Sequence, residues 1–99
     1  MFAMIREGTA DRDKMAQGRA QVEEFHRLRA QQPGYRGGVS VDTGDGKTLI
    51  VSLWDTPEQA EAAGEKMKPE ADRLLGSLWT TPTRVIARGP VLYNDISAG

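Results

Sequence analysis

A β-hairpin is predicted near the middle of the chain, where two β-strand patterns flank a glycine-rich turn. Residues 35–42 place tyrosine, glycine and valine at every second position, and residues 48–54 (Thr-Leu-Ile-Val-Ser-Leu-Trp) are almost continuously apolar. Such alternation is typical of a strand with one buried face. Residues 43–47 contain an Asp-Gly pair, which tolerates the positive φ angles of a tight turn. The pattern therefore predicts two antiparallel strands side by side.

The segment before the hairpin predicts one strand and one helix. Residues 2–7 form a short apolar strand, and we expect its charged end, Arg6-Glu7, near the sheet edge or a pocket mouth. Residues 9–13 are polar and favour a helix start, and Pro33-Gly34 ends the helix. Small or apolar residues recur at helical spacing and would face the sheet: Met15, Gly18, Val22, Phe25 and Leu28. Glycine at position 18 suggests the close approach of another backbone.

A second helix is predicted directly after the hairpin. Thr56 is the expected N-cap, Pro57 occupies the first helical position, and Gln59 completes a capping box. Pro69 lacks a backbone N–H and crowds the preceding turn. We therefore expect a kink there, or two short helices.

The end of the chain predicts a last strand. Residues 80–82 (Thr-Thr-Pro) close the helical segment, residues 83–93 are β-rich, and residues 94–99 form a tail. Gly89-Pro90 suggests a bulge or edge irregularity. The order β-α-β-β-α-β predicts a single ferredoxin-like α+β domain over residues 1–99, with two helices on one face of a four-stranded antiparallel sheet.

Both faces of the later strands are apolar, which two helices cannot cover. Leu49, Val51 and Leu53 point one way, and Ile50 and Trp54 point the other. The last strand is similar, with Val85, Ala87 and Val91 opposite Ile86 and Leu92. The second face predicts a partner, for which a second copy of the chain is the simplest choice. The alternative is that these residues are tolerated on the surface.

Composition narrows the function. Thirteen basic residues against fourteen acidic give a net charge of −1, which argues against nucleic acid or an anionic membrane as partner. The chain has no cysteine and one histidine, so neither a thiolate nor a histidine-rich metal site is expected. No apolar stretch is long enough to span a bilayer, and the apolar run at the start of the sequence is too short for the hydrophobic region of a secretory signal. We expect a cytoplasmic protein without a membrane segment.

Two motifs resemble the antibiotic-biosynthesis-monooxygenase-like group of dimeric α+β barrels. One is Pro-Gly-Tyr-Arg-Gly-Gly at residues 33–38, and the other is Val-Ser-Leu-Trp-Asp-Thr-Pro-Glu at residues 51–58. The resemblance covers nearly the whole chain. It implies a homodimer in which two sheets face each other inside a ring of helices. Members include cofactor-free oxygenases of aromatic polyketides, quinol oxygenases and haem-degrading enzymes.

The resemblance also argues against haem degradation. That branch uses an asparagine on the first strand and a tryptophan and a histidine on the second helix. Here the first strand ends in Arg6-Glu7, Ala62 stands at the tryptophan position, and no histidine follows His26. We therefore expect no cofactor. The polyketide branch also relies on a pocket asparagine, whereas the one asparagine here, Asn94, lies in the tail.

Two residues are candidates for catalysis. His26 has the only side chain with an ordinary pKa near neutrality, which suits a general acid or base. The alternative is a boundary histidine bonded to a neighbour. Arg88, inside the last strand, could hold an enolate oxygen, or it could pair with Glu7 or Asp42.

Four aromatic residues are candidates for substrate binding. Trp54 and Trp79 could form walls for a flat aromatic ligand, with Phe25 beside them, and Tyr35 could donate a hydrogen bond to an oxyanion. Packing in the core or dimer interface is the alternative for each tryptophan. Three functions stay open: a cofactor-independent oxygenase of a flat aromatic or enolisable compound, a non-catalytic binding or structural dimer, and an isomerase or decarboxylase using His26 with a carboxylate.

Overall fold

Strand β1 (Phe2–Ala10) lies inside a four-stranded antiparallel sheet with the order β2-β3-β1-β4. The computed structural model describes residues 1–95. Strands β2 (Tyr35–Gly44) and β3 (Lys47–Trp54) form the predicted hairpin, and β4 (Trp79–Pro90) pairs with the other side of β1. The ferredoxin-like sheet predicted from the sequence is confirmed.

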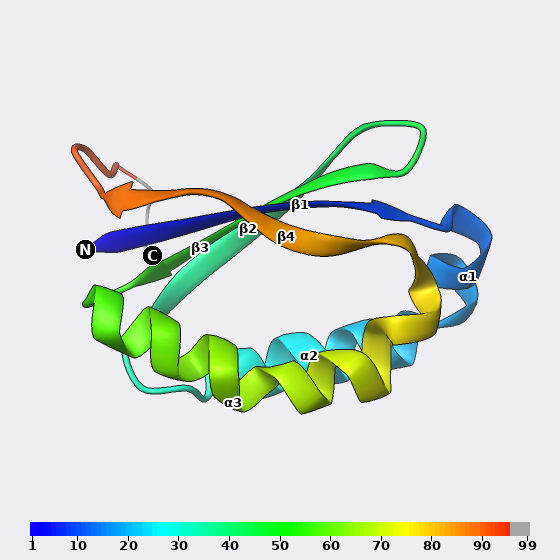
Figure 1. The fold of residues 1–99 in the computed structure, drawn as a ribbon, viewed down its shortest axis with the longest axis horizontal. Helices are drawn as coiled ribbons and strands as arrows, with labels where there is room; N and C mark the ends of the chain where they lie inside the picture. Colours follow the sequence, from blue (N-terminus) through cyan, green and yellow to red (C-terminus); the bar gives the residue numbers. More distant parts are fainter. Residues whose placement is uncertain (96–99) are drawn as a thin grey trace.

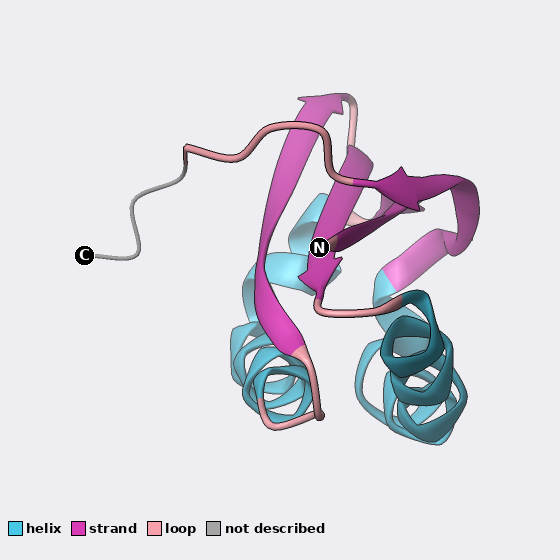
Figure 2. Ribbon diagram, turned by 90° about the vertical axis from the view of Figure 1, so that its left-hand side faces the viewer, coloured by secondary structure: helices cyan, strands magenta, loops and turns pink. Residues whose placement is uncertain are grey.

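The helices of residues 1–95 lie toward one face of this sheet (Figure 1). They are α1 (Arg12–Gln17), α2 (Arg19–Ala30) and α3 (Pro57–Leu75), followed by the 3-10 turn η1 (Gly76–Leu78). Helix α1 lies at the end of the sheet (Figure 1). Helices α2 and α3 run side by side beneath the strands, as Figure 2 shows from the end of the sheet. None of the helices within residues 1–95 is long and apolar enough to cross a membrane.

The first helical region differs from its prediction. Strand β1 continues to Ala10, and the side chain of Asp11 caps α1 by accepting from the backbone N–H of Lys14 at 3.0 Å. The predicted single helix is broken at Gly18. A Cβ there would lie 2.9 Å from the Leu78 side chain, so the close neighbour includes a side chain of η1 rather than only a backbone.

Helix α3 begins as predicted but is not split. Thr56 accepts a hydrogen bond from the backbone N–H of Gln59 at 3.2 Å, and Pro57 is the first helical residue. Pro69 lies inside a single 19-residue helix, so the prediction of two short helices is wrong. Met67 on this helix is buried beneath the sheet, and such tertiary packing offsets the loss of one helical hydrogen bond.

Strand β4 starts at Trp79, four residues earlier than predicted, and ends at Pro90. The expected irregularity at Gly89-Pro90 is wrong, because these residues pair in regular register with Ala3 and Phe2. The register shifts instead at three places along β1, between Ile5 and Arg6, between Glu7 and Thr9, and between Thr9 and Ala10. The first shift leaves one extra residue on β4. Of the predicted tail, residues 96–99 lie outside the described residues.

This bulge reverses the predicted alternation along β4. Arg88 pairs with Met4 and Arg84 pairs with Glu7, so the two arginines lie on opposite faces of the sheet. The sequence pattern predicted Val85 and Ala87 on one face, which is wrong: Val85 pairs with Arg6 and Ala87 with Ile5, because the extra residue shifts the period of two. Of the two arginines, Arg88 is the one on the helix side.

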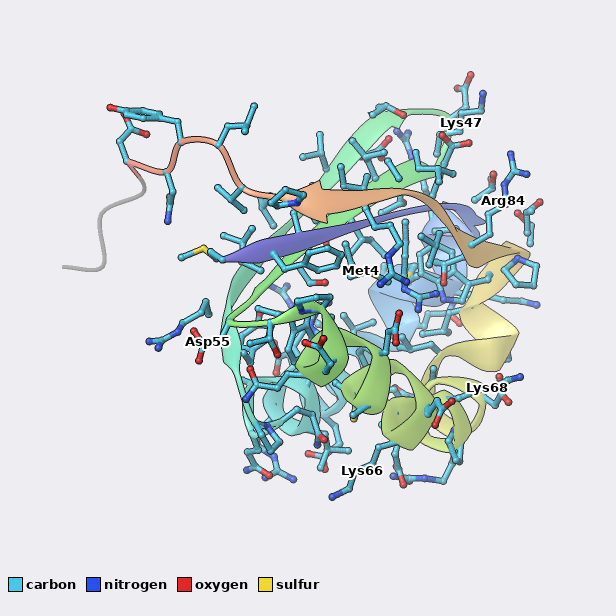
Figure 3. The ribbon with its side chains drawn as sticks, turned by 60° about the vertical axis from the view of Figure 1, so that its left-hand side comes forward. Met4, Lys47, Asp55, Lys66, Lys68 and Arg84 are labelled. Atoms are coloured by element: carbon cyan, nitrogen blue, oxygen red, sulfur yellow. The ribbon has the colours of Figure 1, made fainter. Side chains whose placement is uncertain are left out.

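The core lies between the sheet and α3. Met4, Trp54, Ala60 and Ala63 are buried there, with Tyr35 and Phe2 packed against them. Figure 3 shows Met4 between β1 and α3. Trp54 and Ile50 therefore face the helices, and Leu49, Val51 and Leu53 face away from them. The outward face carries exposed Val39 and Val41, at 54% and 45% exposure, and no described helix covers it.

Candidate functional site

A cavity of about 620 Å³ lies between the sheet and the helix layer. Its walls come from β1, β3, α2 and α3 and from the start of β4. Small side chains on α3 leave much of this space open: Ala60, Ala63, Gly64 and Ala71 line it. The volume is in the range that small-molecule sites occupy.

Three of the four aromatic residues predicted to bind substrate line this cavity: Phe25, Trp54 and Trp79. Trp54 is 3% exposed, and its Nε1–H donates to Ser52 Oγ at 2.9 Å, which satisfies its polar atom. The fourth, Tyr35, is not in the lining. Its ring meets that of Trp54 edge to face, with centroids 5.3 Å apart. These two contacts orient the Trp54 ring.

Two arginines in the lining were not among the predicted site residues. Arg6 shares the helix side of β1 with Met4, and Arg29 follows Phe25 by one helical turn on α2. Both positions have a sequence signal: residue 6 has the parity of residue 4 on a strand, and residue 29 is four after Phe25. The expectation that Arg6 lies near a pocket agrees with its place.

The guanidinium of Arg6 has no hydrogen-bond or ion-pair partner among residues 1–95. Its Nη2 lies 3.7 Å from the position that a Cβ on Gly64 would take. Burial lowers the pKa of Arg6 from its ordinary value. An arginine nevertheless stays protonated in proteins, so it places a positive charge in the cavity wall.

Arg29 connects the cavity to His26. Its Nη2 lies 3.2 Å from His26 Nδ1, and its guanidinium lies 5.5 Å from the ring centre of Tyr35 and 6.0 Å from that of Phe25. The buried Nε of Arg29 has no partner among the described residues. Its contacts are therefore mainly with π faces, which attract a cation without neutralising it.

His26 lies beside the cavity and outside its lining. A guanidinium can only donate, so Nδ1 of His26 must accept and the ring proton sits on Nε2. Burial, followed by the charge of Arg29, lowers the pKa of His26. The imidazole is therefore held neutral, and its role in catalysis stays a prediction.

Arg88 lines a smaller hollow of about 360 Å³ rather than the main cavity. Its Nη2 donates to Glu61 Oε1 at 2.6 Å, and the guanidinium lies 5.2 Å from the ring centre of Phe2. Neither predicted ion-pair partner is the observed one, because the Glu61 carboxylate reaches Arg88 from α3. The two hollows share part of their lining: Met4, Arg6, Ala60, Gly64 and Lys68. Arg6 thus lies where they adjoin.

No group of three histidine, aspartate or glutamate side chains within residues 1–95 is placed to hold a metal ion. The cavity is lined by carbon-rich side chains together with the cations Arg6, Arg29 and Lys68 and one carboxylate, Asp72. Such a set can enclose a flat apolar body and attract negative charge on it.

The structure is a ferredoxin-like α+β fold with a cavity between its sheet and its helices. No protein-family profile matches the sequence. No curated protein matches it either. Solved structures do match, over nearly the whole chain.

A protein from Bordetella bronchiseptica, named as a candidate antibiotic biosynthesis monooxygenase, has a TM-score of 0.75 at 16% identity, covering 93% of this chain and 97% of its own. A variant of SnoaB, a cofactor-independent oxygenase from Streptomyces nogalater, has a TM-score of 0.71 at 14% identity, covering 97% of each chain. A similarly named protein from Nitrosomonas europaea has a TM-score of 0.72 at 14% identity, covering 94% of this chain and 100% of its own. The chain has the fold of antibiotic-biosynthesis-monooxygenase-like proteins, which confirms the resemblance at the level of the fold.

Proposed function

We propose that the chain is a small cytoplasmic, homodimeric, cofactor-independent monooxygenase-like enzyme. Its substrate is a flat aromatic or enolisable compound bound between the helices and the sheet. The observation that carries the proposal is the cavity of about 620 Å³ lined by Phe25, Trp54 and Trp79. Because flat rings prefer aromatic walls, this lining favours a planar ligand over a flexible one. The description of SnoaB as a cofactor-independent oxygenase supports the reaction class.

The proposed reaction needs no group beyond substrate and dioxygen. A base removes a proton from an activated CH₂ of the substrate, and the resulting carbanion or enolate transfers electrons to O₂. One oxygen atom enters the product as a carbonyl, the other leaves as water, and the substrate supplies the electrons. An apolar cavity with fixed positive charges stabilises the anion on which this chemistry depends.

We keep His26 as the proposed base and Arg88 as the proposed anion-holding residue. His26 is neutral and adjoins Phe25, so it has the protonation state that a base requires. Arg88 lies on the helix side of β4, next to the hollow that adjoins the cavity. Proton transfer to His26 requires that Nδ1 exchange Arg29 for the substrate.

The proposed dimer forms through the outward face of the sheet. Ile5, Val39 and Val51 lie in one row across three strands on that face. Covering such a row of apolar side chains with a second sheet removes them from water and stabilises the dimer. Docking of two such faces would produce the barrel that the resemblance implies.

The second candidate is a non-catalytic binding module. It is favoured by the location of His26 outside the cavity lining. In that case the same cavity holds a flat compound without converting it, and oxygen is not consumed.

Both tryptophans of the chain line the cavity, so intrinsic fluorescence reports its occupancy. The test is a titration with hydroxylated anthrones and naphthols, followed by oxygen-electrode and ¹⁸O₂ mass-spectrometric assays of the compounds that bind. The proposal expects saturable quenching and one ¹⁸O atom in the product. Binding without oxygen uptake would favour the binding module, and the absence of any binding would overturn both.

A matched pair of variants at Gly64 shows whether the signal comes from the cavity. A Cβ at this position would meet only Arg6 Nη2, at 3.7 Å, so Gly64→Ala fits the existing space. Gly64→Leu extends further into the cavity and should abolish quenching and oxygen uptake. Unchanged binding to Gly64→Leu would place the ligand elsewhere.

A further inference from the structure

We propose that the cavity selects a planar aromatic carboxylate and that Arg6 binds its carboxylate group. The inference rests on the proposed function only in taking the cavity to be the binding site. It adds the charge and functional group of the ligand, and it assigns to Arg6 the role of a specificity-determining residue.

Arg6 differs from most of the other arginines in having no carboxylate partner among the described residues. Six of the arginines form ion pairs with carboxylates: Arg12, Arg19, Arg27, Arg36, Arg73 and Arg88. Arg6, Arg29 and Arg84 do not, within residues 1–95. Arg6 and Arg29 are the two of these that line the cavity. The arginines that lack a carboxylate thus include both that face the internal space.

Arg6 occupies an interior position in the sheet. It lies on β1, an interior strand of the sheet, opposite Ile50 of β3, and its side chain reaches toward Gly64 of α3. Arg6 is partly buried, and removing part of the water around a guanidinium has a cost that a paired negative charge offsets. The nearby carboxylate of Glu61 is bonded to Arg88, and Asp72 on the cavity wall makes no ion pair with Arg6. The missing negative charge can be supplied by a ligand.

The geometry and charge of a guanidinium indicate which anionic group of a ligand would bind to Arg6. A guanidinium presents parallel N–H groups that match the two oxygens of a carboxylate. A carboxylic acid has a pKa near 4 and arrives ionised at neutral pH, whereas a phenol with a pKa near 10 arrives neutral and would leave Arg6 uncompensated. The carboxylate is therefore the group that suits this site.

The other residues of the cavity wall indicate the charge and the body of the ligand. Arg29 and Lys68 add positive charge to the lining, and Asp72 is the single acidic residue there among those described. The net charge of the wall favours an anion over a neutral compound. The rings of Phe25, Trp54 and Trp79 supply surface for the aromatic body.

The test compares two probes of nearly the same shape, 2-naphthoate and its neutral amide, 2-naphthamide, by isothermal titration calorimetry on the full chain. Wild-type protein should bind 2-naphthoate at least tenfold more tightly. Arg6→Met should remove that preference while keeping the affinity for 2-naphthamide, and Arg6→Lys should keep part of it. Arg84→Met is the matched control, because Arg84 lies on the outward face of β4, and it should leave the preference unchanged.

The outcomes separate this inference from the proposed function. Equal affinity for both probes in wild type, or a preference that survives in Arg6→Met, overturns the carboxylate assignment while leaving the cavity as a binding site. Tighter binding of 2-naphthol than of 2-naphthoate overturns it in favour of a phenolic ligand. Binding of neither probe by a folded protein overturns the assignment of these aromatic compounds to the cavity. Circular dichroism of each variant shows that the fold is retained.

Discussion

The guanidinium of Arg29 donates to Nδ1 of His26 across 3.2 Å and thereby keeps the single histidine of the chain neutral. Protonation of His26 would break this bond and set two cations against each other. Burial is the larger cause of the lowered pKa of His26, and the charge of Arg29 adds to it. The arrangement links the protonation of one helix residue to the stability of the whole chain.

The first prediction is a pH-dependent loss of stability that depends on His26. Since its pKa is lower in the folded state than the ordinary 6.5, the unfolded state binds more protons just below that pH. The contribution to stability is complete above about pH 7 and is lost as the pH falls through and below the ordinary value of 6.5. Urea unfolding across this range should therefore show a steeper loss for wild type than for His26→Asn. Parallel pH profiles for the two proteins would show that His26 does not carry the effect.

The second prediction concerns catalysis by His26. His26→Ala should abolish turnover of an identified substrate, because the proposed base is removed, while binding measured by tryptophan fluorescence stays within about twofold. Arg27→Ala is the control, since Arg27 is bonded to Glu24 on the exposed side of the same helix. Full activity of His26→Ala would remove this residue from the mechanism.

The third prediction separates a structural from a functional role of Arg88. Its ion pair with Glu61 is partly exposed, so Arg88→Met and Glu61→Gln should each change the free energy of unfolding by less than about 1 kcal/mol. If Arg88 holds the substrate anion, Arg88→Met lowers kcat/KM at least tenfold, whereas Glu61→Gln, which keeps the cation, does not. Equal kinetic effects of the two variants would reduce Arg88 to a surface contact.

The parts of the fold that were predicted correctly depend on local signals. The Asp-Gly turn of the hairpin and the Thr56 cap of α3 are encoded within a few residues each. The parts predicted wrongly depend on contacts between distant segments. The helix break at Gly18 adjoins Leu78, and the bulge in β4 is defined only by its register with β1.

The site shows the same division. The aromatic lining residues Phe25, Trp54 and Trp79 were found because large rings are conspicuous in the sequence. Arg6 was missed as a site residue because what distinguishes it is the lack of an ion-pair partner among the described residues. Which charged side chains pair is determined by the tertiary structure, so the sequence does not reveal it. Arg88 pairs with Glu61 across the layers, a contact that the strand order alone does not reveal.

The fourth prediction tests the contact between the hairpin turn and the end of β1. Gly46 has a φ of +82°, and a Cβ on it would clash with the carbonyl oxygen of Ala10, whose N–H is bonded to the Gly46 carbonyl. Gly46→Ala should lower the free energy of unfolding by about 1–3 kcal/mol because of backbone strain, and the steric clash should lower it further. Gly76→Ala is the control, since Gly76 has helical angles and no atom within 4 Å of the added Cβ. Chemical denaturation of both should show a loss for the first and no loss for the second, and equal stability of the two would contradict the strained turn.

The last prediction concerns the homodimer. The row Ile5, Val51 and Val39 lies on the sheet face that no described helix covers, and Val39 is 54% exposed. Val39→Asp places a charge in the proposed interface without disturbing the buried core, so it should convert a dimer into a folded monomer. Lys66→Glu is the control, because Lys66 lies on the side of α3 away from the sheet (Figure 3), and it should leave the dimer intact. Multi-angle light scattering at micromolar concentration gives the mass directly. A wild-type mass near the 10.8 kDa of one chain would exclude the shared barrel, and a dimer that survives Val39→Asp would place the interface on another face.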